Sequence, residues 1–325
     1  MKISRRTALK GAAAVPFARI AGAHAQTQWP TKAVRVISGG SAGGGSDISF
    51  RLVEAQLREK FGQPFVIENL TGVGGTTGAA AAAKATDQHT FFISNVASNA
   101  IGVSLFKKFP FDPKTELPGV ARLCTVTNAL VVPANSGISD VKQFLERVKA
   151  EPAKAFFGSA GPGTTSHLSG LMLGQKLGVE LTHVPYKGTA ANLTALLRND
   201  VMFSVENLPV VISNVQAGNL KILAISQARR SPLFPDIPTL QEAGLPEFDM
   251  FSWYGVSAAN ATPRDVINRV SEEINAALKT KGVVARFRDI GSDAAPLNAW
   301  DFDRFIAAEI EKWGTLVKSS GARSD

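Results

Sequence analysis

The sequence predicts an α/β protein with two lobes, each a mainly parallel sheet flanked by helices. Three observations carry this prediction. Short strand-like runs alternate with longer helical patterns, which is typical of parallel strands covered by helices. A segment rich in proline and glycine, 229–249, breaks the alternation and is expected to be an ordered loop that crosses between lobes. The chain has 325 residues, which suits two cores better than one.

The strands are expected where short apolar runs occur between turn residues. These runs are 34–37, 65–68, 91–94, 130–132, 155–157, 181–184, 202–205, 222–225 and 254–257. The first helix is predicted over 48–61, where Phe50, Val53, Leu57 and Phe61 recur every three or four residues. That spacing places them on one buried helix face.

The end of the chain is predicted to be helical. Thr262 and Pro263 are typical of an N-cap and a first helical residue, and an apolar stripe follows over 266–278. A last helix is predicted over 301–318, with its aromatic side chains packed in a core. With a second crossing expected near 126–128, lobe 1 should comprise 26–127 and 251–325, and lobe 2 should comprise 128–250.

The first 25 residues are typical of an export signal. They hold five basic residues and no acidic one, then a weakly apolar stretch and the cleavage pattern Ala23-His24-Ala25. The twin arginine Arg5-Arg6 favours the Tat route over Sec. We therefore expect a periplasmic protein cleaved near Ala25. Its formal charge of +8 owes much to this segment, and no basic run with interleaved aromatics remains, so we expect no nucleic-acid partner.

Two turns of small residues, each between a strand and a helix, carry the functional signal. They are Gly-Gly-Ser-Ala-Gly-Gly-Gly-Ser-Asp over 39–47 and Ser-Ala-Gly-Pro-Gly-Thr-Thr-Ser-His over 159–167. Such a turn leaves unpaired N–H groups at a helix start, beside hydroxyl side chains and the positive end of the helix dipole. Each is a candidate anion cradle. Lys187 is the nearest candidate cation.

Two catalytic interpretations, a hydrolase and a nicotinamide-dependent enzyme, are alternatives to simple binding. Gly39-Gly40-Ser41-Ala42-Gly43 matches the nucleophile elbow, but a hydrolase needs a histidine late in the chain and the last one is His183. A nicotinamide-dependent enzyme could place a ribose on Glu68, although no turn has the full G-x-G-x-x-G spacing. The histidines and the single Cys124 lack metal-ligand spacing, so we expect no metal and no cofactor. Cys124 is expected to be buried.

The turns, in this order, resemble the Bug-type (TctC-like) solute receptors of tripartite tricarboxylate transport. The likeness spans nearly the whole chain after the signal. The matching stretches are Trp29-Pro30, Gly43-Gly44-Gly45-Ser46-Asp47, Glu68-Asn69, Gly72-Val73-Gly74-Gly75, Phe111-Asp112-Pro113, Gly158-Ser159-Ala160-Gly161, Ser166-His167-Leu168, Val184-Pro185-Tyr186-Lys187-Gly188, Asn207-Leu208-Pro209, Pro238-Thr239, Glu242-Ala243-Gly244-Leu245-Pro246, Trp253 and Lys312-Trp313.

The resemblance implies a type II-like periplasmic-binding-protein fold, in which two lobes close on an organic carboxylate. It implies a non-catalytic, monomeric receptor whose partners are a mono-, di- or aromatic carboxylate and the membrane subunits of a tripartite tricarboxylate-type transporter. An orphan receptor that serves sensing is the alternative. Together with the turns it gives this candidate ligand-binding set: Ser41, Ala42, Gly45, Ser46, Asp47, Asn95, Ser98, Ser159, Gly163, Thr164, Thr165, Ser166, Thr189 and Glu206.

Several positions depart from the family pattern. An aromatic residue and prolines usually precede the glycines of the first turn, where Gly40, Ser41 and Ala42 stand here. The opened turn favours a bulkier or less polar carboxylate. Glu206 stands in a strand that usually carries two aspartates, so a ligand with an α-amino group is not implied. Asp47 is left with two roles, to cap its own helix or to face the ligand.

Overall fold

The computed structural model describes residues 29–320 and residue 322, so the predicted export signal lies outside the described residues. In chain order the strands are β1 (Val34–Ser38), β2 (Phe65–Asn69), β3 (Thr90–Asn95), β4 (Gly119–Pro133), β5 (Phe156–Ser159), β6 (Thr182–Pro185), β7 (Phe203–Asn207), β8 (Leu220–Ile225), β9 (Phe251–Ala258) and β10 (Ser292–Leu297). The helices are α1 (Gly45–Phe61), α2 (Thr76–Ala83), α3 (Gly102–Leu105), α4 (Val141–Ala150), α5 (Thr165–Leu177), α6 (Thr189–Leu197), α7 (Leu208–Gln216), α8 (Arg264–Ala277), α9 (Lys281–Asp289) and α10 (Ala299–Ser320).

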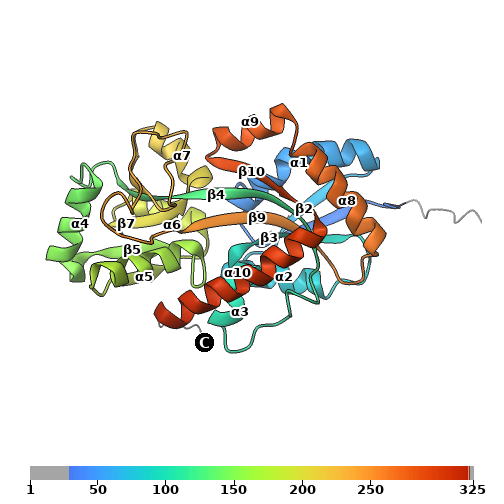
Figure 1. Ribbon diagram of the computed structural model, residues 1–325, viewed down its shortest axis with the longest axis horizontal. Coiled ribbons are helices and arrows are strands. Elements are labelled where there is room, and N and C mark those ends of the chain that lie inside the picture. Colours follow the sequence, from blue (N-terminus) through green and yellow to red (C-terminus); the bar gives the residue numbers. More distant parts are fainter. Residues whose placement is uncertain (1–28, 321, 323–325) are drawn as a thin grey trace, which may run out of the picture.

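One long strand connects the two halves of the molecule. β4 and β9 run side by side across the middle of Figure 1, with the green and yellow elements on one side and the blue and dark orange ones on the other. Residues 119–127 of β4 pair with β9, whereas residues 128–133 pair with β7 and β8. This change of partners supports the predicted lobes, 26–127 with 251–325 and 128–250, whose boundaries we keep as a proposal.

The two lobes repeat one arrangement. In the first, β2, β1 and β3 are parallel, and β9, β4 and β10 follow in antiparallel order. In the second, β6, β5 and β7 are parallel and β4 joins them antiparallel. The predicted two-lobed α/β fold is confirmed. The antiparallel centre was not predicted, because strand–helix alternation reports only the strands that helices connect.

The helices bury the stripes that their spacing predicts, with one correction. Phe50, Val53 and Leu57 of α1 are buried in the first lobe.

The predicted cap at Thr262 and Pro263 is wrong by one residue. Pro263 has an extended backbone with ψ 144°, so it occupies the N-cap place and the helix begins at Arg264. The Thr262 N–H belongs to the preceding turn, since it donates to the carbonyl of Ala259.

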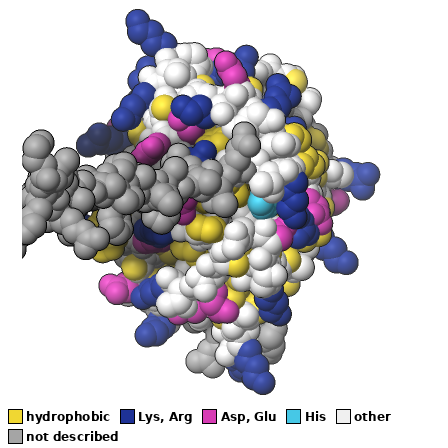
Figure 2. Space-filling model, turned by 90° about the vertical axis from the view of Figure 1, so that its right-hand side faces the viewer, with side chains coloured by type: hydrophobic (Ala, Val, Ile, Leu, Met, Phe, Trp, Pro, Cys, Tyr) yellow, Lys and Arg dark blue, Asp and Glu magenta, His cyan; other side chains and the backbone are white. Residues whose placement is uncertain are grey.

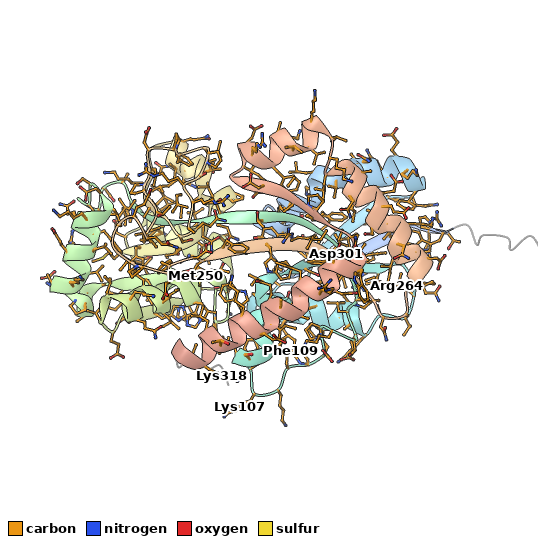
Figure 3. All side chains as sticks on the ribbon, in the orientation of Figure 1. Lys107, Phe109, Met250, Arg264, Asp301 and Lys318 are labelled. Carbon is orange, nitrogen blue, oxygen red and sulfur yellow. The ribbon has the colours of Figure 1, made fainter. Side chains whose placement is uncertain are left out.

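The last helix contacts both lobes. α10 packs against α3 and β4 and also reaches α5. Asp301 and Lys318 lie near its two ends in Figure 3, where the helix runs obliquely from the middle of the molecule to its lower left. Inside it, the Glu309 carboxylate accepts hydrogen bonds from the indole N–H groups of Trp253 (2.8 Å) and Trp313 (2.7 Å). This buried triad fastens β9 to α10.

The surface carries mixed charge. Lys and Arg side chains are interspersed with acidic ones over the face shown in Figure 2. Within the described residues, no helix combines the length and the apolarity needed to cross a bilayer.

Removing the acceptor of the Trp253–Glu309–Trp313 triad should destabilise the fold. Glu309→Ala leaves two buried indole N–H groups without a partner, so the free energy of unfolding should fall by about 2–4 kcal/mol. Urea denaturation measures this change. Glu311→Ala, an exposed glutamate on the same helix, is the matched control and should change stability by less than about 0.5 kcal/mol. Equal effects of the two variants would contradict the role given to the triad.

Candidate functional site

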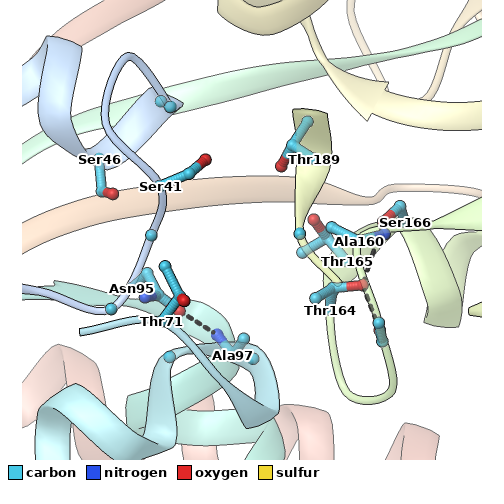
Figure 4. A pocket seen from close by; sticks show the side chains of 18 of the residues that line it. Ser41, Ser46, Thr71, Asn95, Ala97, Ala160, Thr164, Thr165, Ser166 and Thr189 are labelled. Atoms are coloured by element: carbon cyan, nitrogen blue, oxygen red, sulfur yellow. Dashed lines mark hydrogen bonds between the residues drawn. The ribbon is translucent and has the colours of Figure 1, made fainter. Parts of the chain in front are cut away.

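A cavity of about 630 Å³ lies between the lobes. The first lobe lines it with the turn after β1, the 71–75 turn, and the side chains of Asn95, Ser252 and Tyr254. The second lobe lines it with the turn after β5, residues 186–189, and the end of β7 at Glu206 and Asn207. Figure 4 shows the hydroxyl side chains of the two lobes facing each other across it.

Helix starts converge on this cavity. The first residues of α1, α5 and α6 line it, as does the glycine-rich turn that precedes α2. Gly44 and Gly188, at the N-caps of α1 and α6, supply no side-chain hydrogen bond to the helix. Uncapped N–H groups and several helix dipoles therefore point toward one space, which favours a bound anion.

Several hydroxyls of the lining have no hydrogen bond to any described residue, and four of these are labelled in Figure 4. Ser41 and Thr71 come from the first lobe, and Thr165 and Thr189 come from the second. The Asn95 side chain adds an amide, since only its carbonyl oxygen is used, accepting from the N–H groups of Ala97 and Ser98. These groups can donate hydrogen bonds to a ligand from both sides.

Glycine permits the close approaches that shape the cavity. A Cβ atom on Gly39 would lie 2.5 Å from the Cα atom of Gly75, so the first turn and the 72–75 turn touch. A Cβ atom on Gly74 would lie 3.5 Å from the carbonyl oxygen of Pro162, in the other lobe. The two lobes are therefore in near contact at one edge of the cavity.

A stacked pair of histidines contacts the turn after β5 and lies outside the cavity lining. The rings of His167 and His183 have their centroids 4.1 Å apart. His183 Nε2 lies 2.6 Å from the Ser159 hydroxyl, and His167 Nδ1 accepts from the N–H of Gly163. Burial lowers the pKa of each histidine to about 4, so both are neutral near pH 7. A neutral His167 can accept the hydrogen bond from the Gly163 N–H, whereas a protonated His167 could not.

The structure brings nine of the predicted site residues to the cavity. They are Ser41, Gly45, Ser46, Asn95, Thr164, Thr165, Ser166, Thr189 and Glu206.

The other five predicted residues lie outside the lining. Ala42 is exposed at the tip of its turn. The Asp47 carboxylate is used locally, accepting from the Gly43 N–H (3.1 Å) and from the Arg51 guanidinium (2.9 Å). This is the capping role rather than the ligand-facing one.

Three more of the predicted residues are buried next to the lining without belonging to it: Ser98, Ser159 and Gly163. The Ser98 hydroxyl donates to Asn99 Oδ1 at 2.8 Å. Ser159 is buried beside His183, and Gly163 is buried with φ +77°, where its Cβ atom would meet Leu105 of the first lobe. Their small or polar side chains shape the turns and do not reach the cavity.

Sequence reasoning missed part of the site. Thr71 and the 72–75 turn line the cavity, and so do Asn207, Ser252 and Tyr254. The 72–75 turn had a signal, because it is a third glycine-rich turn before a helix. Ser252 and Tyr254 had none, since they reach the cavity only through the antiparallel pairing of β9 with β4.

The geometry of the cavity does not support the hydrolase or the nicotinamide-dependent enzyme. Among the described lining residues there is no histidine to activate Ser41. Glu68 lies outside the lining and accepts from the Arg35 guanidinium at 2.6 Å. Cys124 is buried, as predicted, and burial raises the pKa of its thiol to about 12. No group of three metal-ligating side chains occurs within the described part of the chain.

Comparisons with known proteins show what the whole chain is similar to. A family described as "Tripartite tricarboxylate transporter family receptor" matches residues 49–322. Protein BugT of Bordetella pertussis is 30% identical over 311 residues, which are 95% of each chain. R. palustris Rpa4515, solved with adipate, is similar with a TM-score of 0.88 and 31% identity, covering 91% of this chain and 99% of that one. MatC (Rpa3494) of Rhodopseudomonas palustris, solved with bound malate, has a TM-score of 0.82 and 29% identity, covering 89% and 100%.

A methyl group at the start of α1 should damage the site. The Cβ atom of Gly45→Ala would lie 3.0 Å from two ring carbons of buried Tyr254, which cannot move aside freely. We expect a loss of about 1–3 kcal/mol in the free energy of unfolding, measured by urea denaturation. Gly282→Ala, also in a first helical turn but with open space around it, should be neutral or stabilising. A Gly45→Ala protein as stable as the wild type would contradict the close approach.

The histidine pair predicts a pH dependence of stability. A histidine with pKa about 4 when folded and 6.5 when unfolded makes the unfolded chain bind more protons between these values. The free energy of unfolding should therefore fall as the pH drops from 6.5 toward 4, by about 1 kcal/mol or more per histidine after allowance for partial exposure. Urea denaturation of wild type and His183→Gln at pH 7, 6 and 5 tests this. The variant should lose less stability, and parallel curves would count against buried neutral histidines.

Proposed function

Because this chain belongs to the tripartite tricarboxylate transporter family of receptors, as a Bug-type (TctC-like) solute receptor, we propose that it captures a small organic carboxylate between its lobes. In this proposal it acts in the periplasm, without catalysis, and delivers the ligand to the membrane subunits of a tripartite tricarboxylate-type transporter. The observation that carries the proposal is the convergence of helix starts and unpartnered hydroxyls from both lobes on one cavity.

The chemistry of the lining supports an anionic ligand. The cavity offers backbone N–H groups, hydroxyls and one amide, and the described lining holds a single basic side chain, Lys187. Neutral donors bind a carboxylate through many modest hydrogen bonds rather than through one strong ion pair. Such a ligand can be held and later released. The size of the cavity lies within the range of small-molecule sites.

Two relatives support the ligand class. Rpa4515 was solved with adipate and MatC with malate, and both are dicarboxylates. The match with this chain covers 99% of the Rpa4515 chain and 100% of the MatC chain. We therefore extend to this protein the class of ligand, a small organic carboxylate, and leave the identity of the acid to experiment.

Capture would couple binding to closure of the lobes. Donors come from the first turn on one lobe and from the 160–166 turn on the other, so a ligand meets both sets only when the lobes are close. The near contact of Gly74 with Pro162 supports the closed arrangement as a stable one. The closed, loaded form is the one that a membrane partner would recognise.

A ligand screen with matched variants tests this function. A panel of mono-, di- and aromatic carboxylates that includes adipate and malate should contain acids that raise the melting temperature by linkage. For such an acid, Thr165→Ala should weaken binding by about 1–3 kcal/mol in isothermal titration calorimetry, because one buried hydrogen bond is lost. Thr194→Ala, an exposed threonine on α6 with only a local hydrogen bond, is the control.

Two results would contradict the proposal. In the first, no member of the carboxylate panel binds; in the second, Thr165→Ala and Thr194→Ala bind a true ligand equally well. The first result would remove the ligand class, and the second would remove the 160–166 turn from the site.

A further inference from the structure

A buried glutamate stands in a cavity otherwise arranged for anions. Glu206, at the end of β7, is only 5% exposed yet lines the cavity. It is the sole acidic side chain in the described lining. If it were ionised it would repel a carboxylate bound a few ångströms away, and the low dielectric of the site would strengthen that repulsion. The protonation state of Glu206 therefore affects the affinity for a carboxylate ligand.

The neighbours of Glu206 fix where a proton can sit. Asn192 Nδ2 donates to Glu206 Oε1 at 2.6 Å and to the Ser204 hydroxyl at 3.0 Å, which uses both of its N–H bonds. In this orientation Asn192 Oδ1 is buried without a partner, and the reverse orientation would place the two N–H donors there instead. It would also set the amide oxygen against the Ser204 hydroxyl, which already donates to the Gly158 carbonyl, so the first orientation is favoured. Oε1 thus acts as an acceptor, and the proton of a neutral Glu206 belongs on Oε2.

The surroundings favour the neutral acid. Burial, working against hydrogen bonds from Asn192, Ser166 and other neighbours, raises the pKa of Glu206 to about 7. Among the described residues no arginine lines the cavity, and Lys187 is exposed at its rim.

The other titratable groups nearby stay neutral around pH 7. They are Tyr254 on β9, whose pKa is raised by burial, and His167 on α5 with His183 on β6 behind it, whose pKa values are lowered by burial. Neither kind of group neutralises an ionised Glu206, and neither changes charge between pH 6 and 9. A pH dependence of binding in that range would therefore point to Glu206, and a Lys187→Gln variant tests whether the basic side chain of the described lining contributes to it.

We propose that Glu206 is a specificity-determining residue that meets the bound anion as a neutral acid, with its Oε2–H donating a hydrogen bond to a carboxylate oxygen of the ligand. The proton comes from solvent and stays on Oε2, while the ligand remains ionised, so binding takes up one proton. This inference rests on the proposed function. A neutral Glu206 favours ligands that place an anionic acceptor against the end of β7, and it gives no ion pair to ligands that place an ammonium group there.

Calorimetry across pH tests the proton uptake. Adipate and malate are titrated into the wild-type protein from pH 6 to 9, in pairs of buffers with different ionisation enthalpies. Affinity should fall by up to tenfold per pH unit above pH 7, and the buffer dependence of the heat should report uptake of close to one proton at pH 8. This measurement needs no variant, so it does not depend on how a variant folds.

Variants assign the proton to a residue. Glu206→Gln keeps the shape and a donor but cannot titrate, so its affinity should be flat with pH and its binding should take up no proton. Lys187→Gln should keep the wild-type pH slope. Glu59→Gln, an exposed glutamate on α1 outside the lining, should match the wild type throughout.

The outcomes separate this inference from the function on which it rests. Binding of adipate or malate without proton uptake, affinity that rises with pH, or uptake that persists in Glu206→Gln would overturn the neutral-acid role while leaving a carboxylate receptor in place. Loss of the slope in Lys187→Gln would overturn it as well. Failure of the wild type to bind either acid at any pH, or any other carboxylate, would remove the proposed function and this inference together.

Discussion

The constraint on which the site depends is that parallel strands in both lobes end at the same cleft. β1 and β2 lead into glycine-rich turns on one side, and β5 and β6 lead into turns on the other. A helix follows each turn, so its N-terminus must point into the space where the strand stopped. In open parallel sheets, ligands bind at the carboxyl ends of the strands for this reason. Two such sheets, joined by β4, place their helix starts around one cavity.

This arrangement explains how an anion could be held with little fixed positive charge. Helix dipoles and backbone N–H groups supply partial charges that need no counter-ion in the empty protein. Two polar side chains of the turns already have partners: Asp47 binds Arg51 and Gly43, and Ser159 contacts His183. The hydroxyls of Ser41, Thr71, Thr165 and Thr189 are left for a ligand. Glu206 is the exception, and its burial makes it sensitive to protonation.

The sequence predicted the elements better than their connections. Periodicity located α1 and most strands, but it missed β10 and predicted only residues 130–132 of β4. Two small-residue turns pointed to the start of α1 and of α5. Periodicity could not predict that β4 pairs antiparallel with β9, because side chains alternate in the same way in either direction. Tyr254 and Ser252 were missed as a consequence, since they approach the turns only through that pairing.

Residues within the turns show the same limit at smaller scale. Ala42, Ser98, Ser159 and Gly163 belong to the right segments but do not reach the cavity. The direction of a turn residue depends on its backbone angles, as at Gly163 with φ +77°, and composition does not determine these. Asp47 had two chemically sound roles, and only the position of Arg51 one helical turn later decided between them.

An amide titration by nuclear magnetic resonance measures directly whether helix N-termini hold the ligand. In ¹⁵N-labelled protein, saturation with a carboxylate that binds should move the backbone N–H signals of Gly45, Ser46, Thr165 and Ser166 downfield together, because each would gain a hydrogen bond to an anion. Amides at distant helix starts, such as those of α8 and α9, should stay in place. If the carboxylate binds and the four signals do not move, helix N-termini do not hold the ligand.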